Sequence, residues 1–473
     1  MEGYIVSLII FTCIFALFSL GLNLQWGLTG LINFGHVAFM AVGSYVVVIL
    51  TLPGYLKEIP TQLLDEFNWM QETPWVAAGL QSLATILPQQ IPLIGAVLIG
   101  ACTAAGLGVL AGVATLKLRT DYLAIVTVGL SEILRSIALN EEWLTKGTFG
   151  IQRFPLPLST LNPNVIMRMG MIVVLTIVLG LALWHQWQWA KRTMRSASAQ
   201  ALLRSSSLLL GYLGSLLGVV VMVGWGSQQL KASAAISNGV TGAFLIGAIA
   251  LLIGLYRWVW LTWMSSLPAL TEGTALITSI TVTGLSLWLY GYGSSAIYHY
   301  DRNPTKTGLM WISVLLVALT FWALQRLSNS PWGRVLKAIR EDETVATALG
   351  KNVFWYKLQS LMLGGAIAGM AGALYAWQLT TVYPDNFRPI ETFNAWTIVV
   401  LGGAGSNVGT LIGAIIFWAY QTLTRFILGD VIPLNDAQIG AFRVMLIGLL
   451  LMGLMIWRPQ GILGNKEELT LDR

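Results

Sequence analysis

Charged residues are scarce in this sequence. Asp, Glu, Lys and Arg make up 10% of the 473 residues, while hydrophobic residues make up 56%. A typical soluble domain carries about 25% charged residues. This composition excludes an ordinary soluble protein, and no polar stretch is long enough for a large soluble domain. We therefore predict an all-α, polytopic integral membrane protein. In such a chain the net charge of +6 reports on topology, so we expect no nucleic-acid partner.

Residues suited to metal binding or redox chemistry are few as well. The two cysteines, Cys13 and Cys102, both fall in apolar stretches, which favours small core residues over a disulfide framework. None of the three histidines has a second His or Cys at metal-ligand spacing, so we expect neither a metal site nor a cofactor. No group of residues has a spacing typical of catalysis, and we predict a protein that is not an enzyme.

The sequence also lacks the phosphate-binding pattern G-x-x-x-x-G-K-[ST]. Gly350 and Lys351 come nearest to it, but Asn352 follows them and the earlier glycine is missing. The chain is therefore not expected to bind ATP through a P-loop. If its work is driven by ATP, the ATPase must be another chain.

Residues 330–357 form a polar segment between two apolar stretches of membrane length, 309–327 and 358–381. Pro331 is typical of a first helical turn and Gly350 of a helix end. The segment therefore predicts one short helix at the membrane surface.

This predicted helix is amphipathic. Leu336, Ile339 and Leu349 would share one face, and Lys337 and Glu341 would be neighbours one turn apart. A helix of this kind could lie across the membrane surface and press a face of apolar and charged groups against a soluble partner.

Apolar stretches recur along the chain and predict roughly thirteen crossings, one of them half-length. They cover residues 4–26, 28–52, 93–116, 122–139, 169–187, 207–225, 240–260, 275–292, 309–327, 358–381, 392–401, 408–428 and 442–457. A basic run without acids at 191–204 marks a cytoplasmic loop. We expect a polar outer loop at 57–73 and an interfacial segment at 75–87.

Residues 392–401 are the half-length stretch. A cytoplasmic tail requires four crossings after the polar segment at 330–357, and only three long apolar stretches follow it. A broken helix that ends at Gly402 and Gly403 would supply the fourth. Irregular backbone at that depth is tolerated only inside protein or beside a cavity, so this element is expected to line a pathway.

Five stretches resemble the branched-chain amino acid ABC transporter permease family, and the match is closest to its second permease type, which has an RPxGxxG tail. They are GLNLQWGLTGLINFGHVAFMAVGSY (21–45), LKLRTDYLAIVTVGLSEILR (116–135), GRVLKAIREDETVATALG (333–350), TIVVLGGAGSNVGTLIGA (397–414) and RPQGILG (458–464). Several independent motifs in the same order make the resemblance specific. Residues 199–296 look like an insertion of extra spans relative to that family.

The resemblance implies a type II ABC importer permease, a helical bundle with broken or half helices. It implies a bacterial plasma (inner) membrane location and alternating-access uptake of branched-chain or neutral amino acids. The expected partners are a second homologous permease chain, two cytoplasmic ABC ATPase subunits, an extracytoplasmic substrate-binding protein, the lipid bilayer and the amino acid substrate. ATPase coupling would fall to Gly333, Arg334, Ala338, Ile339, Arg340, Glu341, Asp342, Ala346, Leu349 and Gly350.

Candidate residues for the substrate pathway are polar or glycine residues within the spans: Asn33, His36, Thr127, Glu132, Gly402, Gly403 and Ser406. Ionisable groups in a span suggest a functional site. Each candidate also has a structural alternative. A lone histidine can be a satisfied core group, Glu132 can pair with Arg135 one turn away, and the glycines can serve close helix packing.

Three other functions stay open. The family also includes permeases suited to urea or short amides, and a related sugar permease would share the glycine pattern. A proton-coupled secondary transporter would need acid relays in several spans, and only Glu132 suggests one. The expected organisation is 1–140 N-terminal core spans, 141–306 outer loop and inserted spans, 307–329 inward span, 330–357 coupling segment, 358–457 C-terminal core spans and 458–473 cytoplasmic tail.

Overall fold

The computed structural model describes residues 2–116, 120–159, 161–194 and 267–431, with single positions at 254, 440, 445, 448, 461 and 462. Six helices within these ranges are long and apolar enough to cross a membrane, or up to eight if each of two bent pairs is one span. The predicted all-α, polytopic membrane fold is therefore confirmed. The spans predicted at 207–225, 240–260 and 442–457 and the tail 458–473 lie outside the described residues, apart from the single positions.

The chain forms two compact units. The first comprises Met1–Val178, Leu289–Ile415 and Leu463–Arg473, and the second comprises Leu179–Trp288 and Ile416–Ile462. Within the described helices, the chain passes from one unit to the other in α9 (Val165–Met194), α12 (Leu267–Tyr298) and α18 (Asn407–Val431). In the second unit the side-chain amide of Gln186 donates to the carbonyl oxygen of Ser279 at 3.1 Å. Every candidate residue discussed below lies in the first unit.

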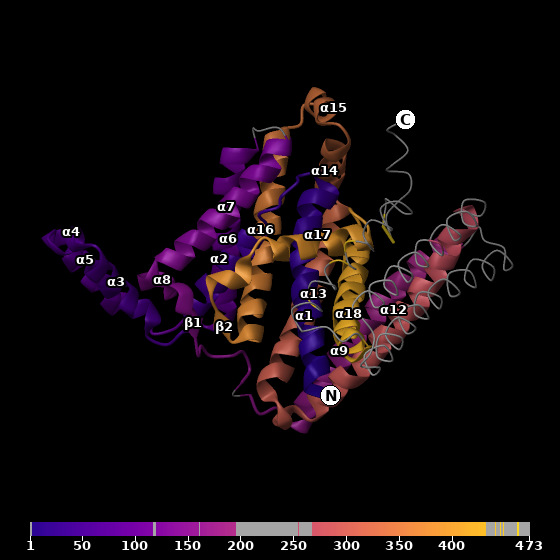
Figure 1. Cartoon of the computed structure of the whole chain (residues 1–473), viewed down its shortest axis with the longest axis horizontal. Helices are drawn as coiled ribbons and strands as arrows, with labels where there is room; N and C mark the ends of the chain where they lie inside the picture. Colours follow the sequence, from indigo (N-terminus) through magenta and orange to yellow (C-terminus); the bar gives the residue numbers. More distant parts are fainter. Residues whose placement is uncertain are drawn as a thin grey trace, which may run out of the picture. The chain divides into compact units, whose positions relative to one another are not determined.

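Helix α16 (Val353–Leu379) is the central helix of the first unit (Figure 1). Around it pack α6 (Leu93–Thr115), α2 (Val37–Thr51) and α1 (Glu2–Leu22). The same unit also contains α7 (Thr120–Asn140), α8 (Glu142–Thr145), η2 (Gly147–Phe149), η3 (Tyr300–Arg302), α13 (Pro304–Ser328), α14 (Pro331–Glu341), α15 (Glu343–Ala348), η4 (Pro384–Phe387) and α17 (Ile390–Gly402), and the helices described below. A short antiparallel pair, β1 (Ile151–Gln152) with β2 (Thr381–Val382), joins the loop after η2 to the end of α16.

Glycines allow the backbones of these helices to come into direct contact. Gly43 of α2 lies against Gly369 of α16, so a methyl group on Gly43 would collide with the Gly369 backbone. Gly372 lies in the same way against the backbone of Met40. Small residues at such crossings allow van der Waals contact between backbones, which is the main attraction available between helices in lipid.

Two helices of the first unit break inside the span region. Helix α1 runs into a π-helical turn, η1 (Asn23–Leu28), and the chain then stays non-helical until α2. The span predicted at 28–52 is therefore corrected, because its first residues form a loop. Helix α17 has 13 residues and meets α18 at a bend of 117°. Its length of about 20 Å is shorter than a hydrocarbon core of about 30 Å, which agrees with the predicted half-length helix.

The expected polar loop at 57–73 is wrong, because most of it is helical. Helices α3 (Tyr55–Glu66), α4 (Asn68–Gln71) and α5 (Pro74–Ile86) fill the connection between α2 and α6, and α3 packs against α5. Pro53 and Gly54, which are typical of turns, separate α2 from α3, and the helix begins again directly after them.

A glycine-to-alanine substitution, which adds one methyl group, tests the backbone contact between α2 and α16. We expect Gly43→Ala to destabilise the protein by about 1–3 kcal/mol, because the added group overpacks a backbone contact. Gly106→Ala on α6 is the matched control, since nothing lies within 4 Å of its added methyl group. Equilibrium unfolding in mixed SDS micelles measures both. Equal stability of the two variants would contradict the backbone contact.

Candidate functional site

The coupling segment consists of two helices, not the single helix that the sequence predicted. Helices α14 and α15 meet at Asp342, whose backbone is extended. Its carboxylate accepts hydrogen bonds from the Thr344 hydroxyl at 2.6 Å, the Thr344 amide at 2.7 Å and the Val345 amide at 3.1 Å. Asp is among the preferred N-cap residues, which explains the restart of the helix. The Thr344 hydroxyl and the two amides lower the pKa of Asp342.

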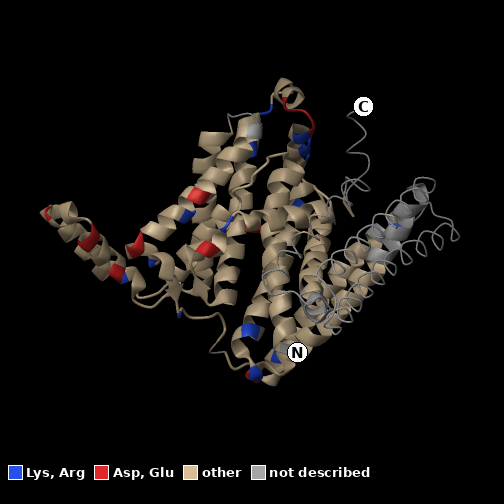
Figure 2. Cartoon of the chain, in the orientation of Figure 1, with Lys and Arg blue, Asp and Glu red and all other residues tan. Residues whose placement is uncertain are grey.

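The two helices bury one set of residues and expose another. Leu336, Ile339 and Ala346 are buried. Leu349 is 71% exposed, so the prediction that it shares a face with Leu336 and Ile339 is wrong. Gly333 lies against the backbone of Ser328, where a side chain would collide. The exposed members of the predicted coupling set are Arg334, Ala338, Glu341, Asp342, Leu349 and Gly350. In Figure 2 the basic residues of α14 and the acidic turn before α15 lie together at the top of the view.

Arg340 connects the coupling segment to the broken end of α1. Its Nη1 donates to the carbonyl oxygen of Gly27 in η1 at 2.5 Å. The side chain also packs against Gly30 and lies beside Gly405 in the turn between α17 and α18. One guanidinium therefore contacts the ends of two helices that break inside the bundle.

Buried amide side chains extend this connection. The Asn23 Oδ1 accepts from the Gly405 amide at 2.9 Å, and its Nδ2 donates to the Asn407 Oδ1 at 3.1 Å. The Asn407 Nδ2 in turn donates to the Gln325 Oε1 on α13 at 3.2 Å. We call Asn23, Gln325, Arg340, Gly405 and Asn407 the polar junction. It joins α13, α14, η1 and the α17–α18 turn.

Glycine conformation shapes the turn that the junction holds. Gly403 and Gly405 have φ values of +112° and +82°, a region that other residues rarely occupy. Gly402 packs against the backbone of Gly409, so it serves close packing. The Ser406 hydroxyl accepts from the Gly409 amide at 3.0 Å and caps the start of α18.

Three of the predicted pathway residues gather at the loop after η1. Asn33 donates to the Gln25 Oε1 at 2.9 Å and accepts from the Gly35 amide at 2.9 Å. The Thr127 hydroxyl accepts from the Phe34 amide at 3.2 Å, which brings α7 to this loop.

His36 is fully buried at the end of the same loop. Its ring stacks on Phe18 at a centroid distance of 4.8 Å, and its Nε2 lies 3.1 Å from the Phe18 carbonyl oxygen. Asn33 and Thr127 thus meet at this loop, and Asn33 joins it to Gln25 of η1, whereas the His36 ring packs between Phe18 and Phe39.

Glu132 lies apart from that loop. It forms an ion pair with Arg135 at 2.9 Å, and Arg135 also reaches Asp385 of η4 at 3.0 Å. The carboxylate of Asp385 further binds Arg388 at 3.1 Å. This chain of charges fastens α7 to the segment that leads into α17, and a pathway role for Glu132 stays a prediction.

The sequence prediction missed Asn23, Gln25, Gln325 and Asn407. Asn23, Gln25 and Gln325 are neutral polar residues within predicted apolar stretches and Asn407 directly precedes one, a signal that alone could have identified them. Their partners lie up to 384 positions away in the sequence, so the pairing itself could not be read from local pattern.

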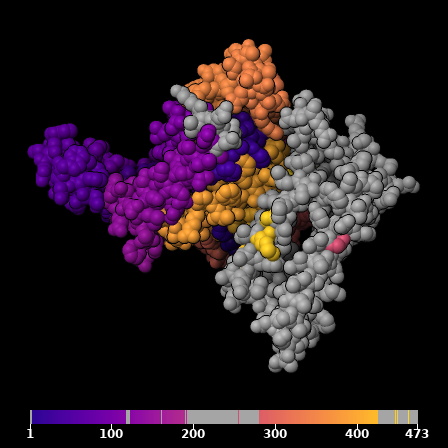
Figure 3. Space-filling model, turned by 45° about the horizontal axis from the view of Figure 1, so that its top comes forward, coloured from indigo at the N-terminus to yellow at the C-terminus, as the bar shows by residue number. Residues whose placement is uncertain are grey.

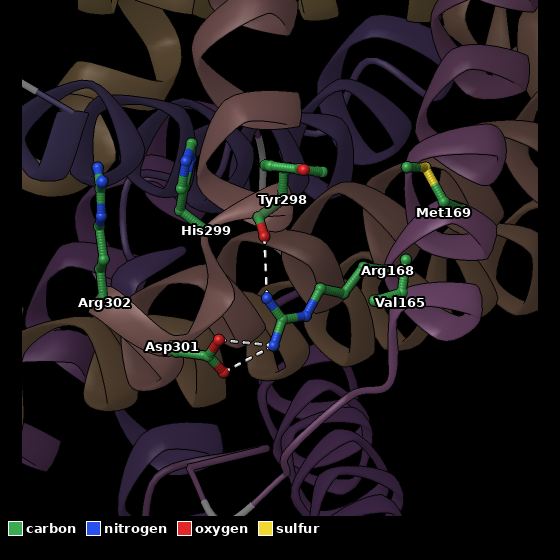
Figure 4. Close-up of a pocket in the computed structure, with 7 residues that line it drawn as sticks. All are labelled: Val165, Arg168, Met169, Tyr298, His299, Asp301 and Arg302. Carbon is green, nitrogen blue, oxygen red and sulfur yellow. Dashed lines mark hydrogen bonds and ion pairs between the residues drawn. The ribbon is translucent and has the colours of Figure 1, made fainter.

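A cavity of about 290 Å³ lies where α9 begins, and none of the residues that line it is a predicted pathway residue (Figure 4). Arg168 reaches across it, with Nη1 3.0 Å from the Tyr298 carbonyl oxygen and Nη2 2.7 Å from both oxygens of Asp301. The ion pair fastens α9 to η3. Among the described residues no three His, Cys, Asp or Glu side chains are placed to hold a metal ion.

Comparison with known proteins identifies the family. The model of the family described as "Branched-chain amino acid transport system / permease component" matches residues 4–193 and 196–455. The high-affinity branched-chain amino acid transport system permease protein LivM of Escherichia coli (strain K12) is 25% identical over 458 residues, which are 97% of this chain and 69% of that protein. No solved structure matches the chain.

Two further relatives cover less of the chain. The probable branched-chain amino acid transport permease protein LivM of Methanocaldococcus jannaschii is 26% identical over 43% of this chain and 60% of its own length. The high-affinity branched-chain amino acid transport system permease protein LivH of Salmonella typhimurium is 27% identical over 54% of this chain and 74% of its own length.

The polar junction predicts a local change in hydrogen exchange. We expect Asn23→Ala to accelerate exchange of the Gly405 amide, because that amide loses its acceptor. The measurement is hydrogen–deuterium exchange of a peptide covering 403–407, read by mass spectrometry.

Asn394→Ala is the matched control, because Asn394 donates only within α17, to Glu391 at 3.0 Å. Unchanged exchange in the Asn23 variant, or equal acceleration in both variants, would show that Asn23 does not hold the turn.

Proposed function

We propose, given that the chain belongs to the family of branched-chain amino acid transport system permease components, that it is the membrane-spanning subunit of an ATP-driven importer for branched-chain or neutral amino acids. In this proposal it works in a bacterial inner membrane by alternating access. A second permease chain would complete the pathway, and an extracytoplasmic binding protein would deliver the substrate. Two cytoplasmic ATPase chains would supply the energy.

The observation that carries this proposal is the bond between Arg340 and the Gly27 carbonyl oxygen. A partner that pushes on the exposed residues of α14 and α15 would move the buried side of the same helices. Arg340 passes that movement to η1, where α1 breaks. The polar junction passes it on to the turn between α17 and α18.

The broken helices are suited to receive such movement. A π-helical turn has one residue too many for an α-helical ladder, and such turns occur often at functional sites. The turn after α17 is held by side-chain amides, not by a continuous helix. A small shift of either break would therefore change access along the bundle without unfolding a full span.

Both helices of the coupling segment begin with a capping residue, and such caps would help the segment to transmit movement without fraying. Ser330 caps α14 by accepting from the Gly333 amide at 3.4 Å, and Asp342 caps α15. Glu343 forms an ion pair with Lys357, so α15 is tied to the start of α16. Force on α15 would thus reach the central helix of the first unit as well as α1.

Crosslinking tests the docking surface. In a background with Cys13→Ala and Cys102→Ala, we expect Ala338→Cys and Val345→Cys to crosslink to the co-purified ATPase, because both positions are exposed. Ala346→Cys is the matched control, since Ala346 is only 2% exposed. A chain that imports substrate without any ATPase, or crosslinks equal at all three sites, would overturn the proposal.

Transport tests the internal link. We expect Arg340→Ala to lower ATP-dependent uptake of leucine in proteoliposomes by about tenfold or more, because a hydrogen bond to a charged group contributes about 1.5–3 kcal/mol. The crosslink at Ala338 should persist, since the exposed surface is unchanged.

Arg326→Ala is the control for loss of an arginine. Arg326 is exposed on α13 and lies over the Trp322 ring at 4.4 Å, outside the polar junction. Uptake by this variant should match that of the natural protein. If Arg340→Ala also transports normally, the link to Gly27 does not transmit movement.

Uptake by cells that lack this chain tests the class of substrate. Cells that lack this chain should lose uptake of labelled leucine and retain uptake of labelled urea. Loss of urea uptake alone would assign the chain to the urea or short-amide type of permease.

A further inference from the structure

The connection between α2 and α6 is a helical hairpin that leaves the body of the first unit. We call α3, α4 and α5, residues 55–86, the lateral hairpin. In Figure 3 it is the indigo lobe at the left of the view. Helix α3 turns away from α2 by 106°, so it runs nearly at right angles to a helix of the span region. An element in this direction runs roughly parallel to the membrane surface.

The hairpin begins at the end of α2 that lies away from the coupling segment. Helix α14 contacts η1 and Gly30, and α2 starts at Val37 and ends at Thr51, from which the hairpin follows. Figure 1 shows α3 and α14 far apart within the first unit. The Tyr55 hydroxyl fixes the root of the hairpin by donating to the Leu144 carbonyl oxygen at 3.0 Å.

Charge is divided unequally between the two long helices of the hairpin. Helix α3 has four charged residues, Lys57, Glu58, Asp65 and Glu66, and all four are exposed. Asp65 and Glu66 line a cavity of about 610 Å³ together with Glu142 and Lys146. Helix α5 has no charged residue at all. One layer of the hairpin is therefore hydrophilic and the other is apolar.

Helix α5 buries none of its residues within the described chain. Trp75 is 79% exposed, Ile86 77% and Leu83 50%, and Trp69 beside α5 is 58% exposed. Contiguous exposed apolar groups of this kind usually mark a surface that another phase or molecule covers. Tryptophans are enriched where a protein meets the membrane interface.

The neighbouring helix indicates what covers α5. Helix α6 begins seven residues after Ile86 and exposes Ile94 to 80%, Leu98 to 59% and Leu110 to 72%. As a membrane span, α6 turns these side chains to lipid. A short connection therefore joins the apolar helix α5 to a span whose exposed apolar side chains suit lipid, and this favours lipid over a protein partner.

We propose that the lateral hairpin is an in-plane membrane anchor in the leaflet opposite the coupling segment. Helix α5 lies at the boundary of headgroups and acyl chains, with Trp75, Leu83 and Ile86 in lipid, and α3 turns its charges to water. Amphipathic in-plane elements enter a bilayer by about 5–10 Å. Because α3 carries three acids and one lysine, insertion depends on apolar contact and not on anionic headgroups.

Spin labels at single cysteines test this placement in nanodiscs of phosphatidylcholine. In the Cys13→Ala, Cys102→Ala background, labels are placed on Leu83→Cys and Ile86→Cys. Collisions with oxygen, which partitions into lipid, should exceed collisions with a water-soluble nickel complex at both sites. Leu98→Cys on α6 should give the same order, and Thr61→Cys, exposed on α3, should give the reverse order. Replacing a third of the lipid with phosphatidylglycerol, or raising the salt, should change none of these orders.

Two results would overturn the anchor. If the nickel complex dominates at Leu83 and Ile86, α5 lies in water. If both reagents are excluded from these sites and not from Leu98, a protein surface covers α5 instead of lipid. All labelled positions are exposed, so the labels leave the packed core intact, and unchanged elution in size-exclusion chromatography checks this for each variant.

Discussion

A polar backbone group within a membrane must find its partner inside the protein, and the first unit depends on how it meets this constraint. Two of its helices, α1 and α17, end within the bundle and leave carbonyl and amide groups without a helical partner. Arg340 satisfies the Gly27 carbonyl, and Asn23 satisfies the Gly405 amide. Side chains from distant parts of the sequence thus replace the hydrogen bonds that continuous helices would make.

The same bonds give the coupling segment a route into the bundle. The buried side of α14 holds Leu336 and Ile339, which anchor it, and Arg340 extends from it to both breaks. The outer side keeps residues such as Ala338 accessible. In the proposed function, one arrangement would serve both structure and transport, because the groups that satisfy the broken helices are the groups that a cytoplasmic partner would move.

The sequence predicted those elements whose signal is local. Long apolar stretches gave α6, α7, α13 and α16, and the short stretch before Gly402 gave the half helix α17. The restart at Asp342 was missed because an aspartate inside a charged run does not stand out as a cap. Helices α3 and α4 of the lateral hairpin were missed because their polar residues suggest a loop, whereas α5 falls on the segment 75–87 that the sequence predicts to be interfacial. The polar junction rests on pairs such as Asn23 and Asn407, which only the folded chain brings together.

In the proposed function, Arg340 transmits the state of the ATPase to the turn between α17 and α18. Hydrogen exchange at 403–407, measured in the assembled transporter with and without ATP, tests it most directly. We expect ATP to change the exchange of this turn in the natural protein and to leave it unchanged in Arg340→Ala. The same ATP-dependent change in both proteins would contradict it.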